Sequence, residues 1–143
     1  MLFRSNDFCK GGSLEVPDAN SIIPLINKLR ELPIFDLIVL TRDWHSKTHC
    51  SFAANNPGTK VFEMIKLSDT GVDQVMWPTH CVQGSTGAEF HKDLVVKKET
   101  DIIVNKGQVE RVDSYSGFGS HPEKTELEEI LKQHQISKIG RDV

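Results

Sequence analysis

The stretch Leu37-Ile38-Val39-Leu40-Thr41-Arg42-Asp43-Trp44-His45 decides the fold class of this 143-residue chain. It opens with a continuous apolar run, which is typical of a strand that is buried on both faces in a parallel sheet. We place this strand at Ile34 to Leu40, with polar residues directly after it. A second apolar run, Ile102-Ile103-Val104, likewise leads straight into Asn105-Lys106-Gly107. Because ligands bind beyond the carboxyl ends of parallel strands, these polar residues are the first candidates for a functional site.

Helical patterns precede and follow these strands. The segment Asn20 to Leu32 is predicted to be a helix with Pro24 in its first turn, where a missing amide hydrogen is tolerated. Thr125 and Glu128 form a capping-box pattern, which predicts a second helix that runs to about Gln133. The apolar residues that recur at helical spacing in the first helix are Ile22, Leu25, Ile26, Leu29 and Leu32.

The order of these elements predicts an α/β fold with a mostly parallel sheet and right-handed crossovers. Residues 1–143 are expected to form one domain. Ile136 to Ile139 is typical of the opening of a third strand, which the last residues of the chain do not continue. The segment Ser46 to Thr100 has no strong periodicity, and loops of that length inside a compact domain are usually functional.

The composition argues against several classes of partner. The formal net charge is -3 and the pI is about 6.1, so no basic field is available to hold nucleic acid. No apolar run approaches the roughly 20 residues of a membrane-spanning helix, and no signal pattern opens the chain. We therefore expect a cytoplasmic protein without a membrane partner. An odd number of cysteines at irregular spacing favours free thiols at Cys9, Cys50 and Cys81.

Asp43 and His45 are the strongest candidates for metal ligands. They lie two apart in an extended segment, so their side chains point the same way and can converge on one divalent ion. His80, in Trp77-Pro78-Thr79-His80-Cys81, is the candidate third ligand, and two histidines with one carboxylate suit zinc, iron or manganese. Alternatively these are polar loop residues, since short matches of this kind also arise by chance. The remaining histidines expected at the surface are His91, His121 and His134.

Lys106 and Cys81 are candidates for a part in catalysis. Lys106, at the end of a buried strand, can present its ammonium to a carboxylate or a developing anion, or can simply be solvated. Cys81 beside His80 suggests a Cys–His pair, but neighbours on a strand point to opposite faces, so we do not expect Cys81 to be a nucleophile. Tyr115-Ser116-Gly117-Phe118 either lines an aromatic pocket or forms a turn against the core.

Several separate motifs follow one another along nearly the whole chain: Asn6-Asp7-Phe8-Cys9-Lys10-Gly11-Gly12-Ser13-Leu14, Thr41-Arg42-Asp43-Trp44-His45, His49-Cys50-Ser51-Phe52, Trp77-Pro78-Thr79-His80-Cys81-Val82, Lys106-Gly107 and Tyr115-Ser116-Gly117-Phe118. In this order they resemble the nicotinamidase/pyrazinamidase branch of the isochorismatase-like cysteine hydrolases. The resemblance implies a three-layer α/β/α fold. It also implies hydrolysis of nicotinamide to nicotinate and ammonia, a step in NAD salvage.

The resemblance further implies roles for individual residues. In such enzymes a cysteine thiolate attacks the carboxamide carbon, an aspartate acts as its base, and a lysine that matches Lys106 supports the charges. A divalent metal, with zinc as the first choice and iron or manganese as alternatives, binds the pyridine nitrogen of the substrate. The residues that match its ligands are Asp43, His45 and His80, with His49 at a position that is a fourth ligand in some members. The residues that match the aromatic binding site are Phe8, Trp77 and Tyr115, the first two as a sandwich around the pyridine ring.

By the same resemblance, parts of the catalytic machinery are expected to be missing. Phe3 occupies the position of the catalytic aspartate, and Asp7 belongs to a loop motif and does not replace it. The first strand is expected to be absent, and the nucleophilic cysteine is expected beyond the end of the chain. We therefore predict a truncated form with little or no activity, with uncovered sheet edges that lower its solubility. The alternatives are a non-catalytic metal- or ligand-binding isoform that pairs with a full-length subunit, and a hydrolase of another small amide; homo-oligomerisation is left open.

Overall fold

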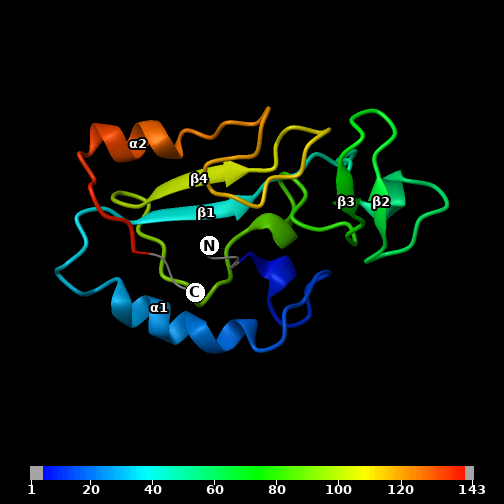
Figure 1. Cartoon of the computed structure of the whole chain (residues 1–143). Helices are drawn as coiled ribbons and strands as arrows, with labels where there is room; N and C mark the ends of the chain where they lie inside the picture. Colours follow the sequence, from blue (N-terminus) through cyan, green and yellow to red (C-terminus); the bar gives the residue numbers. More distant parts are fainter. Residues whose placement is uncertain (1–4, 141–143) are drawn as a thin grey trace.

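The computed structural model describes residues 5–140 (Figure 1). Its strands are β1 (Val39–Asp43), β2 (Met64–Lys66), β3 (Asp73–Val75) and β4 (Ile102–Lys106). Its α-helices are α1 (Ile23–Leu29) and α2 (Leu127–Gln133). Short 3-10 helices lie at Asn6–Phe8, Ala19–Ile22, Ala53–Asn55 and Thr86–Ala88.

Strands β1 and β4 pair in parallel, as the two buried apolar runs predict. The register runs from Val39 opposite Ile102 to Asp43 opposite Lys106, so the polar residues of both strands end at the same edge. The first strand begins later than predicted: the expected range of Ile34 to Leu40 was wrong at its start, where Ile34 is 69% exposed. This pair, with helices on either side, confirms the α/β fold class.

Helix α1 is shorter than the predicted segment, and its buried face differs from the predicted stripe. Pro24 lies in the first turn, as expected. The buried side chains are Ile23 and Ile26, which pack with Cys9 and Leu94 in an apolar cluster. The prediction of a buried apolar stripe was wrong for three of its residues, because only a narrow face of α1 packs against the loop around Leu94. The three that stay exposed are Leu25, Leu29 and Leu32.

Helix α2 lies where the sequence predicts it, but its start is built differently. The Thr125 hydroxyl donates to the Gly117 carbonyl oxygen at 2.6 Å and accepts from the Leu127 N–H at 3.3 Å. Glu128 instead forms ion pairs with Lys124 and Lys132. The capping box was therefore wrong, because both of its side chains have other partners.

The segment from Ser46 to Thr100 contains more structure than its lack of periodicity suggests. Strands β2 and β3 form an antiparallel hairpin within it. The predicted third strand at Ile136 to Ile139 was wrong, since that segment is irregular and Ile139 is 62% exposed. The strand predicted at Ile136 to Ile139 rests on a short apolar run, for which packing partners rather than periodicity decide the structure.

Figure 1 shows α1 and α2 on opposite sides of the β1–β4 pair, with the hairpin beyond the arrowheads of these strands. The segment that carries His80 lies beside the carboxyl end of β1, because His45, just beyond β1, bridges to Val82. Neither described α-helix has the length and apolar character needed to cross a bilayer.

Candidate metal centre

A buried ion pair lies at the carboxyl ends of β1 and β4. Asp43 and Lys106 are opposite each other in the register and are 4% and 1% exposed. The Lys106 ammonium pairs with Asp43 Oδ1 and donates to the Ser114 carbonyl oxygen at 2.6 Å. Burial raises the pKa of the Asp43 carboxyl, and the neighbouring Lys106 cation opposes that rise. The lysine therefore favours the ionised form of a carboxylate that burial alone would neutralise.

His45 lies just beyond β1 and is held by its backbone and its ring. Its N–H donates to the Cys81 carbonyl oxygen at 3.0 Å. Its ring Nδ1 donates to the Gly107 carbonyl oxygen at 2.8 Å, which leaves the lone pair on Nε2. Burial, with the neighbouring His49 and His80 rings, lowers the pKa of His45 to about 3. A ring that is neutral at physiological pH and bonded through Nδ1 is the form that binds a metal through Nε2.

The turn after β4 fits closely around the His45 ring. Gly107 has φ +64, and a Cβ at this position would lie 2.7 Å from His45 Nδ1. The buried Glu123 carboxylate accepts from the N–H groups of Gly107 at 2.8 Å and Gln108 at 2.7 Å. Only glycine fits here, because the backbone is left-handed and the ring occupies the space of a side chain.

His80 approaches from the opposite side, on the segment between β3 and β4. Its Nδ1 donates to the Pro78 carbonyl oxygen at 2.8 Å, which again leaves the lone pair on Nε2. The next residue, Cys81, has φ +46 and donates its N–H to Asp7 Oδ2 at 2.7 Å. The Asp7 carboxylate therefore fixes the turn that carries His80, even though these residues are far apart in the sequence.

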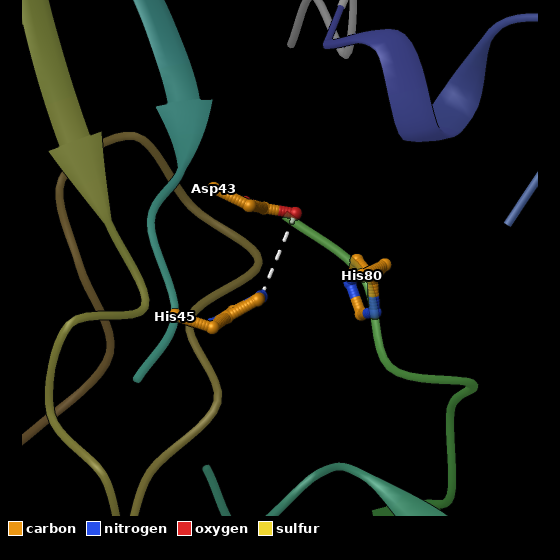
Figure 2. A group of neighbouring side chains, drawn as sticks. All are labelled: Asp43, His45 and His80. Carbon is orange, nitrogen blue, oxygen red and sulfur yellow. Dashed lines mark ion pairs between the residues drawn. The ribbon is translucent and has the colours of Figure 1, made fainter. Parts of the chain in front are cut away.

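The three expected ligands converge, as Figure 2 shows, with Asp43 and His45 from the β1 side and His80 from the facing segment. One donor atom from each lies within 4.8 Å of the others. The distance from Asp43 Oδ2 to His45 Nε2 is 3.9 Å, too long for a hydrogen bond. Ligands of one zinc ion lie roughly 3.3 Å apart at the tetrahedral angle and about 4 Å apart when opposite. The donor types, the ring tautomers and the spacing all fit a divalent metal.

His49, the expected fourth ligand, has partners at both ring nitrogens. Nε2 donates to the Val112 carbonyl oxygen at 3.1 Å, and Nδ1 lies 2.9 Å from Ser51 Oγ. His49 joins His45 and Asp113 in another group of potential metal ligands. Its role as a fourth ligand of the first group stays a prediction.

Of the expected aromatic residues, Phe8 contacts the centre directly, whereas Trp77 and Tyr115 contact each other. Phe8 is buried, with its ring 5.5 Å from the His80 ring in an edge arrangement. Trp77 donates its indole N–H to the Tyr115 hydroxyl at 3.1 Å. Tyr115 also accepts from Gln74, so Trp77 and Tyr115 belong to one hydrogen-bonded group. Their binding of a substrate ring stays a prediction.

None of the described cysteines is placed to act as a thiolate. Burial raises the pKa of the Cys50 thiol to about 11 and also raises the pKa of Cys81. Cys9 packs within the apolar cluster of α1. Phe3, expected at the position of the catalytic aspartate, lies outside the described residues. Residues 5–140 therefore contain the expected metal-binding residues, but none of their cysteines is placed to act as the nucleophile.

The sequence does not predict the part that three carboxylates play in this site, namely those of Asp7, Asp113 and Glu123. Each acts on a segment that is distant in sequence, and no local spacing indicates such contacts. Of the histidines expected at the surface, His121 and His134 are exposed, whereas His91 is half-buried and lies 3.0 Å from the Asn20 amide nitrogen.

Comparisons with known proteins agree on one group of relatives. The chain is 41% identical to the nicotinamidase of Acinetobacter baylyi, over 94% of this chain and 61% of the relative. It is 31% identical to the nicotinamidase of Saccharomyces cerevisiae, over 94% of this chain and 68% of the relative. The chain thus spans 61% to 68% of the length of these curated relatives. No protein-family model matches it.

Solved structures give the same result. A nicotinamidase/pyrazinamidase from Acinetobacter baumannii superposes with a TM-score of 0.85 at 46% identity, covering 95% of this chain and 64% of that one. The yeast nicotinamidase bound to the inhibitor nicotinaldehyde gives 0.83 at 30% identity, covering 93% and 68%. A pyrazinamidase of Pyrococcus horikoshii in complex with zinc gives 0.68 at 35% identity, covering 93% and 62%.

Proposed function

The chain belongs to the nicotinamidase family, and on this premise we propose that the protein containing it hydrolyses nicotinamide to nicotinate and ammonia. One observation carries the proposal: Asp43, His45 and His80 converge, buried, on a single point beside Lys106. The complex of a relative with nicotinaldehyde supports a pyridine-containing substrate.

We propose zinc as the bound ion, with Asp43 Oδ2, His45 Nε2 and His80 Nε2 as its protein ligands. The zinc complex of the pyrazinamidase from Pyrococcus horikoshii supports this choice. When bound, the ion supplies a Lewis-acidic contact for the pyridine nitrogen of the substrate. The Gly107 and Pro78 carbonyl groups hold the two imidazole rings in the tautomer that this ligation requires.

The chain's own residues orient the substrate ring and support the charges of the reaction. Phe8, packed against His80, and Trp77, fixed through Tyr115, offer aromatic faces to a flat ring. The Lys106 ammonium, nearly excluded from water, provides a positive charge at the end of β4. A cation in a dry site stabilises a developing negative charge more strongly than it would in water.

We also propose that the 143-residue chain by itself binds substrate without efficient turnover. The raised pKa values of Cys50 and Cys81 support this, because a thiol rather than a thiolate is a poor nucleophile. Loss of a nucleophile lowers turnover on the order of a millionfold. The chain would then supply the metal-binding part and the ring-binding part of the site.

The test measures binding and turnover separately on the 143-residue chain. Nicotinate should quench tryptophan fluorescence only after zinc is added, because Trp77 lies beside the proposed ring site. Ammonia release from nicotinamide should be on the order of a millionfold slower than for a curated relative. Binding of nicotinate that ignores zinc would contradict the metal's role. Turnover close to that of the relative would contradict the proposal that the cysteines of this chain are poor nucleophiles. His134→Gln, at an exposed histidine, is the control.

A further inference from the structure

A second group of potential metal ligands lies beside the first. In the part of the chain that the structure describes, His45, His49 and Asp113 each offer a donor atom within 4.8 Å of the other two. The two histidines are buried and their ring centroids are 4.2 Å apart, while Asp113 is half-buried. His45 and His49 lie four residues apart on the segment after β1, whereas Asp113 lies on the segment after β4, so the fold brings the carboxylate to the two histidines.

The Asp113 carboxylate is held in place by neighbours, as the carboxylate of a metal site usually is. Its Oδ2 accepts from Gln74 Nε2 at 3.1 Å, and the Tyr115 hydroxyl also hydrogen-bonds to this carboxylate. Gln74 is itself 5% exposed and lies on β3. Such outer partners orient a ligating carboxylate while leaving its remaining lone pairs available.

His45 is common to both groups, and this limits how many ions they can hold. The Gly107 carbonyl occupies Nδ1, so Nε2 is the one His45 nitrogen available to either group. A terminal imidazole nitrogen binds one metal ion at a time. His49 can join by exchanging the contact of its Nδ1 with the Ser51 hydroxyl for a metal bond, while Nε2 keeps the Val112 carbonyl.

We propose that His45, His49 and Asp113 form a second, overlapping site, so that the single divalent ion held by the chain has two alternative positions. Two imidazoles and one carboxylate suit zinc, iron(II) or manganese at this second position, as at the first. The inference shares the bound metal with the proposed function but requires no nicotinamide chemistry. Metal binding without turnover would leave it intact, so the two can fail separately.

The test uses Co²⁺ as a spectroscopic probe on the metal-free chain. His80→Gln removes a ligand that belongs only to the first group, and His80→Gln/Asp113→Asn disables both groups. His80→Gln should still bind one Co²⁺ per chain, with a visible absorption spectrum that differs from that of the wild type. Adding Asp113→Asn should weaken this binding at least about tenfold. His80→Gln/Asp113→Glu, which keeps a carboxylate, should recover part of the loss. His134→Gln is the matched control.

Three results would overturn the proposal. Equal Co²⁺ affinity in the single and double variants would remove Asp113 from the ligand set. Two Co²⁺ ions per wild-type chain would contradict the shared His45 nitrogen. If His80→Gln does not fold, Asp113→Asn alone serves: it should change the Co²⁺ spectrum at unchanged stoichiometry, and an unchanged spectrum would refute the second position.

Discussion

The end of the β1–β4 pair and the β2–β3 hairpin carry the same kind of ion pair in opposite surroundings. Asp43 and Lys106 have side chains that are 5% and 2% exposed. Lys66 and Asp73 on the hairpin form an ion pair of 2.8 Å, with side chains that are 66% and 63% exposed. Water screens the second pair and not the first. Burial therefore determines how much free energy of unfolding is lost when one partner of an ion pair is removed.

Breaking the two ion pairs should have the largest and most unequal effect. Lys106→Met leaves Asp43 buried without its cation and should lower the free energy of unfolding by about 3–5 kcal/mol. Lys66→Met on the hairpin should lower it by less than about 1 kcal/mol. Urea unfolding of the metal-free chain at neutral pH measures both values. Equal losses would show that the Asp43 carboxylate relaxes toward water when Lys106 is gone.

Substituting one glycine in each region should separate backbone strain from crowding. Gly107 and Gly71 have φ +64 and φ +70, so alanine costs about 1–2 kcal/mol at either position. A Cβ at Gly71 meets nothing within 4 Å, whereas at Gly107 it meets the His45 ring. Gly107→Ala should therefore cost more than about 2 kcal/mol and also weaken zinc binding by at least about tenfold. Calorimetric zinc titration gives the second readout, and unchanged affinity in Gly107→Ala would mean that His45 is not held by this turn.

Removing one acceptor in each region should give the smallest difference. The buried Glu123 carboxylate accepts from two N–H groups of the turn after β4, and Glu63 on the hairpin side accepts from the Lys60 N–H at 2.8 Å while exposed. Glu123→Gln turns an amide donor toward a buried N–H and should cost roughly 1–2 kcal/mol. Glu63→Gln should stay within about 0.5 kcal/mol, because water replaces the lost acceptor. Thermal unfolding followed by circular dichroism compares them, and a larger loss in Glu63→Gln would contradict the comparison.

The buried end of the β1–β4 pair could largely be predicted from the sequence. Continuous apolar runs identify β1 and β4, and the polar residues after them, Asp43 and Lys106, do meet at one edge. His80 was predicted as a ligand from its residue type and its motif, and the structure places it beside Asp43 and His45. Its position depends on a bridge between His45 and Val82, which no sequence periodicity predicts. Regular burial on a sheet leaves a regular pattern, whereas contacts between loops leave none.

The exposed β2–β3 hairpin was not predicted from the sequence, and the reason is physical. The hairpin carries Met64 and Val72 at 64% and 52% exposure, so its residues do not alternate between apolar and polar as a half-buried strand does. Ile136 to Ile139 is the opposite case. Its apolar residues have the pattern of a strand, but among the described residues they find no neighbouring strand to pair with. Asp113 and Gln74 act across distant segments, and only the folded chain brings them together.

The contacts that build the metal centre also bear on how the chain folds. The Asp7–Cys81 hydrogen bond joins residues 74 positions apart, and the His45–Gly107 hydrogen bond joins residues 62 positions apart. Closing such long loops is slow, because chain entropy is lost before the contacts form. Pairing of β1 with β4, from Val39 opposite Ile102, closes the loop between His45 and Gly107, whereas the segment that carries His80 must still dock, so the expected ligands should come together after β1 and β4 have paired. A bound ion that stabilises only this late arrangement would leave the folding rate nearly unchanged and act by slowing the unfolding rate.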